Sequence, residues 1–192
     1  MKIVTIYGAS SSQIDGRYMK MANELGKLLA LSGIDCITGG GCEGMMGAVA
    51  KGVLEAGGRV TGIIPQFMVD EGWSNSALSE IIVTKNMHER KQLMAEKSDA
   101  CIALPGGIGT MEELMEIITW RQLSLYNKPV VILNIGGYYD PLISMLEKAI
   151  EEKFMHPKNQ DVWNIAYSPD EVLSAIVLQS QTYFNMRSVA AM

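Results

Sequence analysis

Apolar residues fall into two kinds of segment that alternate along this chain. Short runs rich in Ile, Val and Ala predict buried strands. These runs cover residues 2–8, 34–38, 59–64, 80–84, 100–104, 129–134 and 162–166. Longer segments with apolar residues three and four positions apart predict helices. These segments cover residues 15–31, 45–56, 87–98, 111–125 and 141–154, and a last helix begins at 168–169.

The regular alternation predicts the fold class. Strands that alternate with helices form a parallel sheet with helices on both faces, an α/β architecture. Ligands of such sheets bind beyond the carboxyl ends of the strands, where this chain has its two glycine-rich turns. Residues 66–79 read as a polar connection without regular structure. We expect one domain over residues 1–182 and a loosely held tail over 183–192.

Composition narrows the function classes. The 192 residues are 48% hydrophobic and 19% charged, and the net charge of −5 argues against a nucleic-acid surface. The apolar runs are too short to span a bilayer, and the N-terminus has no signal-peptide layout, so we expect a cytoplasmic protein. Cys36, Cys42 and Cys101 read as reduced core residues. His88 and His156 belong to no metal-binding pattern, so no metal site is predicted.

A strand, a glycine turn and a helix form the central feature of the sequence. Gly106, Gly107 and Gly109 separate the apolar run 100–104 from the predicted helix 111–125. The first backbone N–H groups of a helix lack partners, and together with the helix dipole they bind phosphate. Glu113 follows within one turn, next to the predicted phosphate. The alternative is structural, because Thr110-x-x-Glu113 is also the spacing of a capping box.

The turn after the second predicted strand has a more familiar pattern. Gly39, Gly41 and Gly44 match the dinucleotide fingerprint G-x-G-x-x-G. However, the pattern follows the second strand instead of the first, and no acidic residue ends the next strand. We therefore disfavour a nicotinamide or flavin cofactor, and retain Gly40 and Gly41 as contacts to phosphate or ribose.

Positive charge near the predicted phosphate site comes from the helix at 87–98. Arg90 lies one turn from Leu93 and Met94 and so borders the apolar face, where an arginine either has an anionic partner or covers the core. Lys91 lies one step round the helix and reads as a surface charge. Glu116 shares a helix face with Glu113, whereas Glu112 points about 100° away and reads as the solvent-facing acid.

Five motifs in order along residues 1 to about 180 resemble the LONELY GUY (LOG) family. They are Gly39-Gly40-Gly41-x-x-Gly44-x-Met46-Gly47, Met87-His-x-Arg90-Lys91, Pro105-Gly-Gly-x-Gly-Thr-x-x-Glu113, Ile118-Thr119-Trp120-x-Gln122-Leu123 and Lys128-Pro-Val-x-x-Leu-Asn-x-x-Gly-Tyr-Tyr139. Members are cytokinin riboside 5′-monophosphate phosphoribohydrolases, many of them formerly labelled lysine decarboxylases. The resemblance implies a Rossmann-like, doubly wound sheet and a homodimer. It also implies hydrolysis of the N-glycosidic bond of a purine nucleoside 5′-monophosphate without a cofactor.

Carried over to this sequence, the resemblance makes Arg90 and Glu113 the catalytic pair. It implies further contacts to the nucleotide from Lys91, Gly106, Gly107, Ile108, Gly109, Thr110, Met111, Glu112 and Thr119. An acidic residue in the loop after Pro65 also binds substrate in the family, and the candidates are Glu71 and Asp70. Ile108 and Met111 replace the more usual Tyr and Leu, so the preferred base, adenine or isopentenylated adenine, stays open. A non-catalytic nucleotide carrier is the competing function, and it would not require both Arg90 and Glu113.

Overall fold

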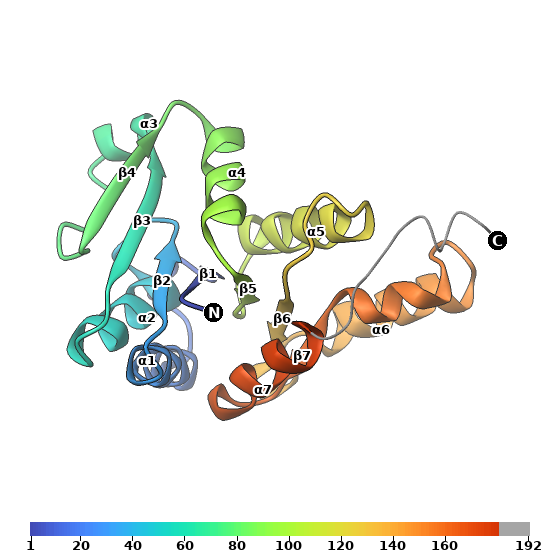
Figure 1. Ribbon diagram of the computed structural model, residues 1–192. Coiled ribbons are helices and arrows are strands. Elements are labelled where there is room, and N and C mark those ends of the chain that lie inside the picture. Colours follow the sequence, from blue (N-terminus) through green and yellow to red (C-terminus); the bar gives the residue numbers. More distant parts are fainter. Residues whose placement is uncertain (181–192) are drawn as a thin grey trace.

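A computed structural model describes residues 1–180 of the chain. Seven strands form one sheet in the order β4-β3-β2-β1-β5-β6-β7, and every neighbouring pair is parallel (Figure 1). The strands are β1 (Ile3–Tyr7), β2 (Asp35–Thr38), β3 (Val60–Pro65), β4 (Glu80–Thr84), β5 (Ala100–Ala103), β6 (Val130–Leu133) and β7 (Asn164–Ala166). The parallel sheet with helices on both faces that the alternation predicted is confirmed, and so is the Rossmann-like, doubly wound fold that the resemblance implied.

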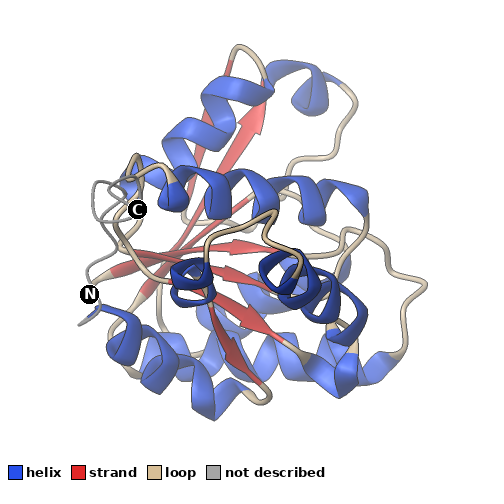
Figure 2. Ribbon diagram, turned by 90° about the vertical axis from the view of Figure 1, so that its right-hand side faces the viewer, coloured by secondary structure: helices blue, strands red, loops and turns tan. Residues whose placement is uncertain are grey.

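Helices cover both faces of this sheet (Figure 2). One apolar core joins the sheet to α1 (Gly16–Leu31), α2 (Gly44–Glu55) and α7 (Pro169–Ser180). The other core joins it to α4 (Met87–Lys97), α5 (Ile108–Gln122) and α6 (Asp140–Glu151). The remaining helical segments are α3 (Gln66–Asp70) and the 3-10 turns η1 (Ile135–Gly137) and η2 (Pro157–Val162).

Strand β1 shows how the alternation of side chains divides the two cores. Val4 and Ile6 point into the core with α1 and α2, whereas Tyr7 belongs to the core with α4 and α5. Thr5 is buried on the second face, and its hydroxyl donates to the carbonyl of Met94 in α4 at 2.7 Å. Side chains of successive strand residues point to opposite faces, so a sheet buried on both sides has apolar residues at nearly every position.

Several predicted segments differ in their bounds: α6 ends at Glu151 instead of 154, and β7 begins at Asn164 instead of 162. Helix α5 begins at Ile108 instead of 111, because the chain already turns into the helix within the glycine-rich segment. Residues 66–79, expected to lack regular structure, contain the short helix α3. The predicted tail at 183–192, and the domain end at 182, lie outside the described residues.

Strands β1 and β5 mark the point where the order of the sheet reverses. From β1 the chain builds outward through β2, β3 and β4, then crosses back to β5 and builds outward in the other direction. The loops at the carboxyl ends of β1 and β5 therefore diverge to opposite faces and leave a crevice, which is where doubly wound sheets bind ligands.

Candidate active site

A cavity of about 520 Å³ lies at this crevice, within the size range of small-molecule sites. The segments that follow five strands, β1 to β5, all contribute to it. Its lining residues are Gly8, Ser10, Gly39, Gly41, Cys42, Glu43, Met46, Ile64, Met68, Gly72, Trp73, Met87, Arg90, Gly109, Glu112 and Glu113. The structure thus brings together the two predicted catalytic residues, Gly39 and Gly41 of the first glycine turn, Gly109 of the second, and several apolar residues; Gly106, Gly107 and Thr110 of the second turn are not among the lining residues.

Arg90 and Glu113 form a buried ion pair on the wall of this cavity. Nη1 of Arg90 lies 2.9 Å from Oε1 of Glu113, and the two side chains are 8% and 9% exposed. The guanidinium is also held by the sheet, since Nε donates to the carbonyl of Ile63 in β3 at 3.1 Å. Of the two interpretations of Arg90, the anionic partner is correct.

The first glycine turn makes room for that guanidinium. A Cβ added at Gly39 would lie 2.2 Å from Nη2 of Arg90, closer than any real contact. The glycine that opens the apparent dinucleotide fingerprint is therefore needed for the packing of Arg90. This gives Gly39 a role that requires no dinucleotide.

The environment of Glu113 changes its protonation. Burial raises the pKa of this carboxyl above the ordinary glutamate value, and the charge of Arg90 only partly offsets that effect. A carboxyl with a raised pKa that faces a cavity is a candidate for proton transfer.

In the second glycine turn, Gly106 packs closely against Thr110, whereas Gly107 and Gly109 have open space beside them. A Cβ at Gly106 would lie 2.1 Å from Oγ1 of Thr110, so this position is closed. A Cβ at Gly107 or Gly109 would meet no protein atom within 4 Å. Gly107 is the N-cap residue of α5 and provides no side-chain cap, so the first N–H groups of the helix remain available to a ligand. The hydroxyl of Tyr138 holds the turn by donating to the carbonyl of Gly106 at 2.6 Å.

The capping-box interpretation of this turn is wrong. Because α5 begins at Ile108, Thr110 lies inside the helix and cannot be its N-cap. Glu113 is instead paired with Arg90 across the interface between two helices. Its carboxylate is therefore positioned at the cavity by tertiary contacts.

Lys91 is not the surface charge that its position on the helix indicated. Its side chain is 9% exposed, and its ammonium contacts the carboxylates of Glu112 and, at 3.1 Å, Glu116. Burial lowers the pKa of Lys91, but its hydrogen bonds to these two carboxylates outweigh that effect, and the net pKa is raised. Glu112 is half-exposed, as expected, yet it both lines the cavity and binds Lys91.

Several predicted contact residues lie away from the cavity wall. Thr119 is on the exposed surface of α5, and its hydroxyl donates to the carbonyl of Met115. Eleven residues separate it from Ile108, which is about 16 Å along a helix. Ile108 itself is 82% exposed, and neither it nor Met111 is among the lining residues. Their proposed roles in nucleotide binding remain predictions.

In the loop after Pro65 and in the first glycine turn, too, some residues line the cavity and others do not. Glu71 is the exposed C-cap residue of α3, and the side chain of Asp70 accepts a hydrogen bond from Gln66 at 2.8 Å. Neither carboxylate lines the cavity, whereas the neighbouring Gly72 does. Gly41 also lines it, but Gly40 does not.

Cys42 differs from the sequence prediction as well. Cys36 and Cys101 are buried core residues as predicted, but Cys42 is exposed and lines the cavity. The sequence predicts burial because Cys42 follows closely on a strand, but the glycine turn places this residue at the surface.

Sequence reasoning missed the apolar lining residues. The sequence analysis predicts no role in the site for Met46, Met68 or Met87, and Trp73 falls in the segment expected to lack regular structure. Met46 follows β2, Met68 and Trp73 follow β3, and Met87 follows β4, so no single spacing along the sequence groups them.

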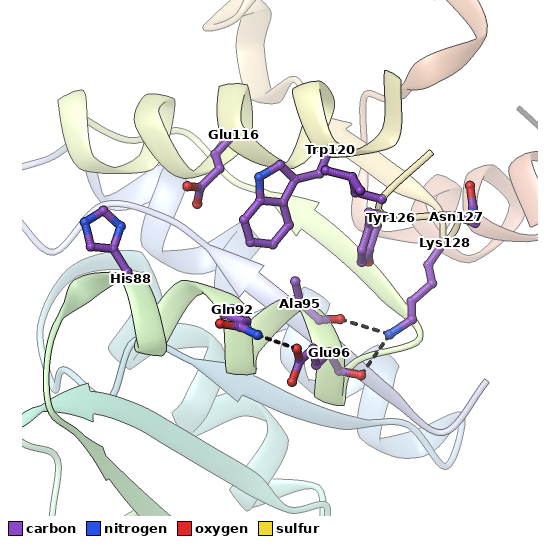
Figure 3. Close-up of a pocket in the computed structure, with 10 residues that line it drawn as sticks. His88, Gln92, Ala95, Glu96, Glu116, Trp120, Tyr126, Asn127 and Lys128 are labelled. Atoms are coloured by element: carbon purple, nitrogen blue, oxygen red, sulfur yellow. Dashed lines mark hydrogen bonds between the residues drawn. The ribbon is translucent and has the colours of Figure 1, made fainter. Parts of the chain in front are cut away.

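A second cavity, also of about 520 Å³, lies between α4 and α5 (Figure 3). Its lining residues are His88, Gln92, Ala95, Glu96, Glu116, Trp120, Leu125, Tyr126, Asn127 and Lys128. Neither Arg90 nor Glu113 is among them. Glu116 lines this cavity and Glu112 lines the first, so Lys91 connects the walls of the two. Over residues 1–180, no three His, Cys, Asp or Glu side chains are grouped so as to hold a metal.

Known proteins resemble this chain in sequence and in structure. The model of a family described as "Possible lysine decarboxylase" matches residues 46–176. A rice protein (Oryza sativa subsp. japonica) named "Probable cytokinin riboside 5'-monophosphate phosphoribohydrolase LOGL2" is 42% identical over 90% of this chain and 71% of its own length. The Arabidopsis thaliana protein "Cytokinin riboside 5'-monophosphate phosphoribohydrolase LOG5" is 39% identical over 91% of this chain and 77% of its own length.

A solved structure of a cofactor-binding protein has the same fold. The molybdenum cofactor binding protein of the phototrophic bacterium Rippkaea orientalis superposes with a TM-score of 0.71 at 27% identity. The match covers 92% of this chain and 95% of that protein.

Proposed function

This chain belongs to the LOG family, and we propose that it hydrolyses the N-glycosidic bond of a purine nucleoside 5′-monophosphate, releasing the free base and ribose 5-phosphate. The observation that carries the proposal is the buried ion pair of Arg90 and Glu113 on a cavity wall beside the open glycine turn of α5.

The chemistry of glycosidic cleavage suits these groups. As the bond between C1′ and N9 breaks, positive charge builds on the ribose ring, as in other reactions of oxocarbenium character. The carboxylate of Glu113 stabilises that charge and accepts a proton from the attacking water, whose oxygen bonds to C1′. The purine leaves with the bonding electron pair and gains a proton, so the products are free base and ribose 5-phosphate. Arg90 positions Glu113 and the substrate.

The glycine turn at the start of α5 binds the 5′-phosphate of the substrate. Gly107 and Gly109 leave space in front of the first N–H groups of α5, and a 5′-phosphate there gains charge-assisted hydrogen bonds and the favourable end of the helix dipole. Binding energy from the phosphate then positions a ribose that has few other groups to hold.

Two other activities fit less well. A lysine decarboxylase needs a lysine amine that can form a Schiff base with its cofactor. Lys91, which follows Arg90 directly, is held between two carboxylates that favour its protonated form. The likeness to the molybdenum cofactor binding protein of Rippkaea orientalis favours a non-catalytic binding or carrier protein, but such a protein has no need of a buried pair with a raised carboxyl pKa.

Release of free base decides between hydrolase and carrier. Incubation with AMP or isopentenyladenosine monophosphate is expected to yield the base, whereas the corresponding nucleosides react about 100-fold more slowly because they lack the phosphate. Glu113→Gln is expected to lower kcat about 10²–10⁴-fold while nucleotide binding survives. The matched control is Glu116→Gln, one turn further along α5 and outside this cavity. Nucleotide binding without release of base would support the carrier, and equal rates on AMP and adenosine would refute the phosphate site.

The oligomeric state and the cellular location of the protein are also part of the proposal. We infer that the protein acts in the cytoplasm as a homodimer, with the end of α5 at the interface. Leu123 and Leu125 next to that helix are 44% and 72% exposed, and the groove between α4 and α5 contains the partly buried Trp120. No described helix is both long and apolar enough to cross a membrane. Light scattering that gives the monomer mass at working concentration would contradict the dimer.

A further inference from the structure

The lining of the catalytic cavity is chemically divided. Arg90, Glu112, Glu113 and Gly109 come from α4 and α5 and suit the phosphate, the ribose and the attacking water. The apolar lining residues are Met46, Ile64, Met68, Trp73 and Met87, and all of them except Met87, the first residue of α4, come from other elements. The proposed reaction assigns nothing to this apolar set, although a purine base must occupy part of the same cavity.

Trp73 is unusual within this set. Trp73 is 54% exposed, although burial of a tryptophan side chain removes a large apolar surface from water and stabilises a fold. Phe67 in α3 is similarly exposed at 51%, but it does not line the cavity. An exposed indole on the wall of a cavity provides a flat apolar surface to a ligand, whereas the exposure of Phe67 has no such target.

Backbone hydrogen bonds fix the position of Trp73 on both sides. Its own N–H donates to the carbonyl of Met68 at 3.0 Å, which anchors it to α3. The next residue, Ser74, forms an antiparallel bridge with Gly41, and the N–H of Asn75 donates to the carbonyl of Gly40 at 2.8 Å. The segment is therefore tied to the first glycine turn and does not behave as a free loop.

We propose that Trp73 is the residue against which the purine base of the substrate stacks, and that it determines the selectivity of the site for purines. The proposal rests on the proposed function. A purine has a larger π-face than a pyrimidine and gains more from stacking on an indole. The thioethers of Met46, Met68 and Met87 are flexible and polarisable, so they adapt to a substituent on the base without a fixed shape.

Binding measured without turnover tests this role. In a Glu113→Gln background, calorimetric titration with AMP and with ribose 5-phosphate separates the base from the sugar phosphate. Adding Trp73→Ala is expected to weaken AMP binding about 10-fold to 100-fold, the range for loss of one stacked base, and to leave ribose 5-phosphate unchanged. Trp73→Phe should retain most of the affinity for AMP, and Phe67→Ala is the matched control with no effect on either ligand.

The outcomes separate this proposal from the proposed function. Equal weakening of AMP and ribose 5-phosphate by Trp73→Ala would mean that the residue only supports the fold, and would overturn the proposal. Unchanged AMP binding, or no binding of AMP to the Glu113→Gln parent, would also overturn it. The activity itself is judged separately, by release of free base from AMP by the unmodified protein, so stacking on Trp73 can hold even where hydrolysis does not occur.

Discussion

At the scale of single residues, the absence of a Cβ at Gly39 determines where the guanidinium of Arg90 lies. The guanidinium of Arg90 occupies the space that a side chain at position 39 would need, and from there it contacts Glu113 and the carbonyl of Ile63. An arginine so enclosed has little freedom to change its conformation. The position of Glu113 therefore depends on a glycine that lies on another element and far away in the sequence.

Gly39→Ala is expected to lower kcat/KM at least 10-fold by displacing Arg90 from Glu113. The added methyl group would lie 2.2 Å from Nη2, so the guanidinium must move out of its present position. Gly16→Ala is the matched control, since a Cβ at Gly16 meets no atom within 4 Å. Steady-state kinetics with circular dichroism would measure the effect in a protein confirmed to be folded. Full activity of Gly39→Ala would mean that the position of Arg90 is not critical.

The pH dependence of the reaction should report Glu113. The ionised carboxylate is the active form in the proposed reaction, so kcat/KM is expected to fall as the pH falls through its pKa. Burial raises that pKa, so the fall should lie above the ordinary glutamate value of about 4.3. Arg90 opposes the shift, and Arg90→Met should therefore move the fall to still higher pH in the residual activity.

The stability of the fold responds to Glu113 in the opposite direction. The native state binds this proton more tightly than the unfolded chain does, so the contribution of Glu113 is fully present below the unfolded pKa. That contribution is lost as the pH rises through the folded pKa. Loss of activity on acidification is thus not unfolding caused by this group. A rate that rises as the pH falls would instead make Glu113 a proton donor.

At the scale of elements, the periodicity of the sequence predicted nearly every strand and helix. The strand at 80–84 agrees at both ends, and the helix predicted from residue 87 begins there, with Asn86 as its N-cap. Helix α3 was missed because its five residues are fewer than two turns and too short to show a period. The burial of Lys91 was missed because it depends on how α4 packs against α5, and helix spacing describes only one helix at a time.

The resemblance to the LOG motifs predicted Arg90 and Glu113 as a catalytic pair, and the structure brings the two side chains together, but these motifs cover only part of the site. The motifs containing Arg90 and Glu113 are compact, and their glycine turns have a direct physical meaning. Trp73 and the cavity methionines come from separate elements that meet only in the folded sheet. The exposure of Cys42 depends likewise on the path of the chain after β2.

The bridge between α4 and α5 is open to a stability test. Lys91→Met removes an ammonium that contacts Glu112 and Glu116, and leaves two carboxylates close together. We expect a loss of about 1.5–3 kcal/mol in the free energy of unfolding, measured by urea denaturation. Lys97→Met, on the exposed last turn of α4, is the control and should stay within about 0.5 kcal/mol of the parent. Equal stability of the two variants would show that the buried contacts of Lys91 merely offset its desolvation.

At the scale of the whole molecule, the cavity depends on the topology of the sheet. Apart from Ile64, which ends β3, its lining residues follow β1 to β5, five neighbouring strands that include both strands at the point where the order reverses. The strands themselves contribute little to the wall, because the chemistry lies on the turns and the first helical turns beyond them. A ligand in the cavity therefore contacts segments spread from Gly8 to Glu113 and links them directly.

Binding of a nucleotide should consequently stabilise the entire fold. A ligand that binds only the native state at 100 times its Kd contributes about 2.7 kcal/mol, which corresponds to a rise in Tm of roughly 5–10 °C for a chain of this length. We expect that rise for AMP with the Glu113→Gln variant, in which the ligand is not consumed during a thermal scan. Adenosine at the same concentration should give a much smaller rise, because it lacks the phosphate that the turn of α5 binds. Equal shifts with both ligands would place the binding energy on the base and sugar, and no shift with millimolar AMP would exclude this cavity as a nucleotide site.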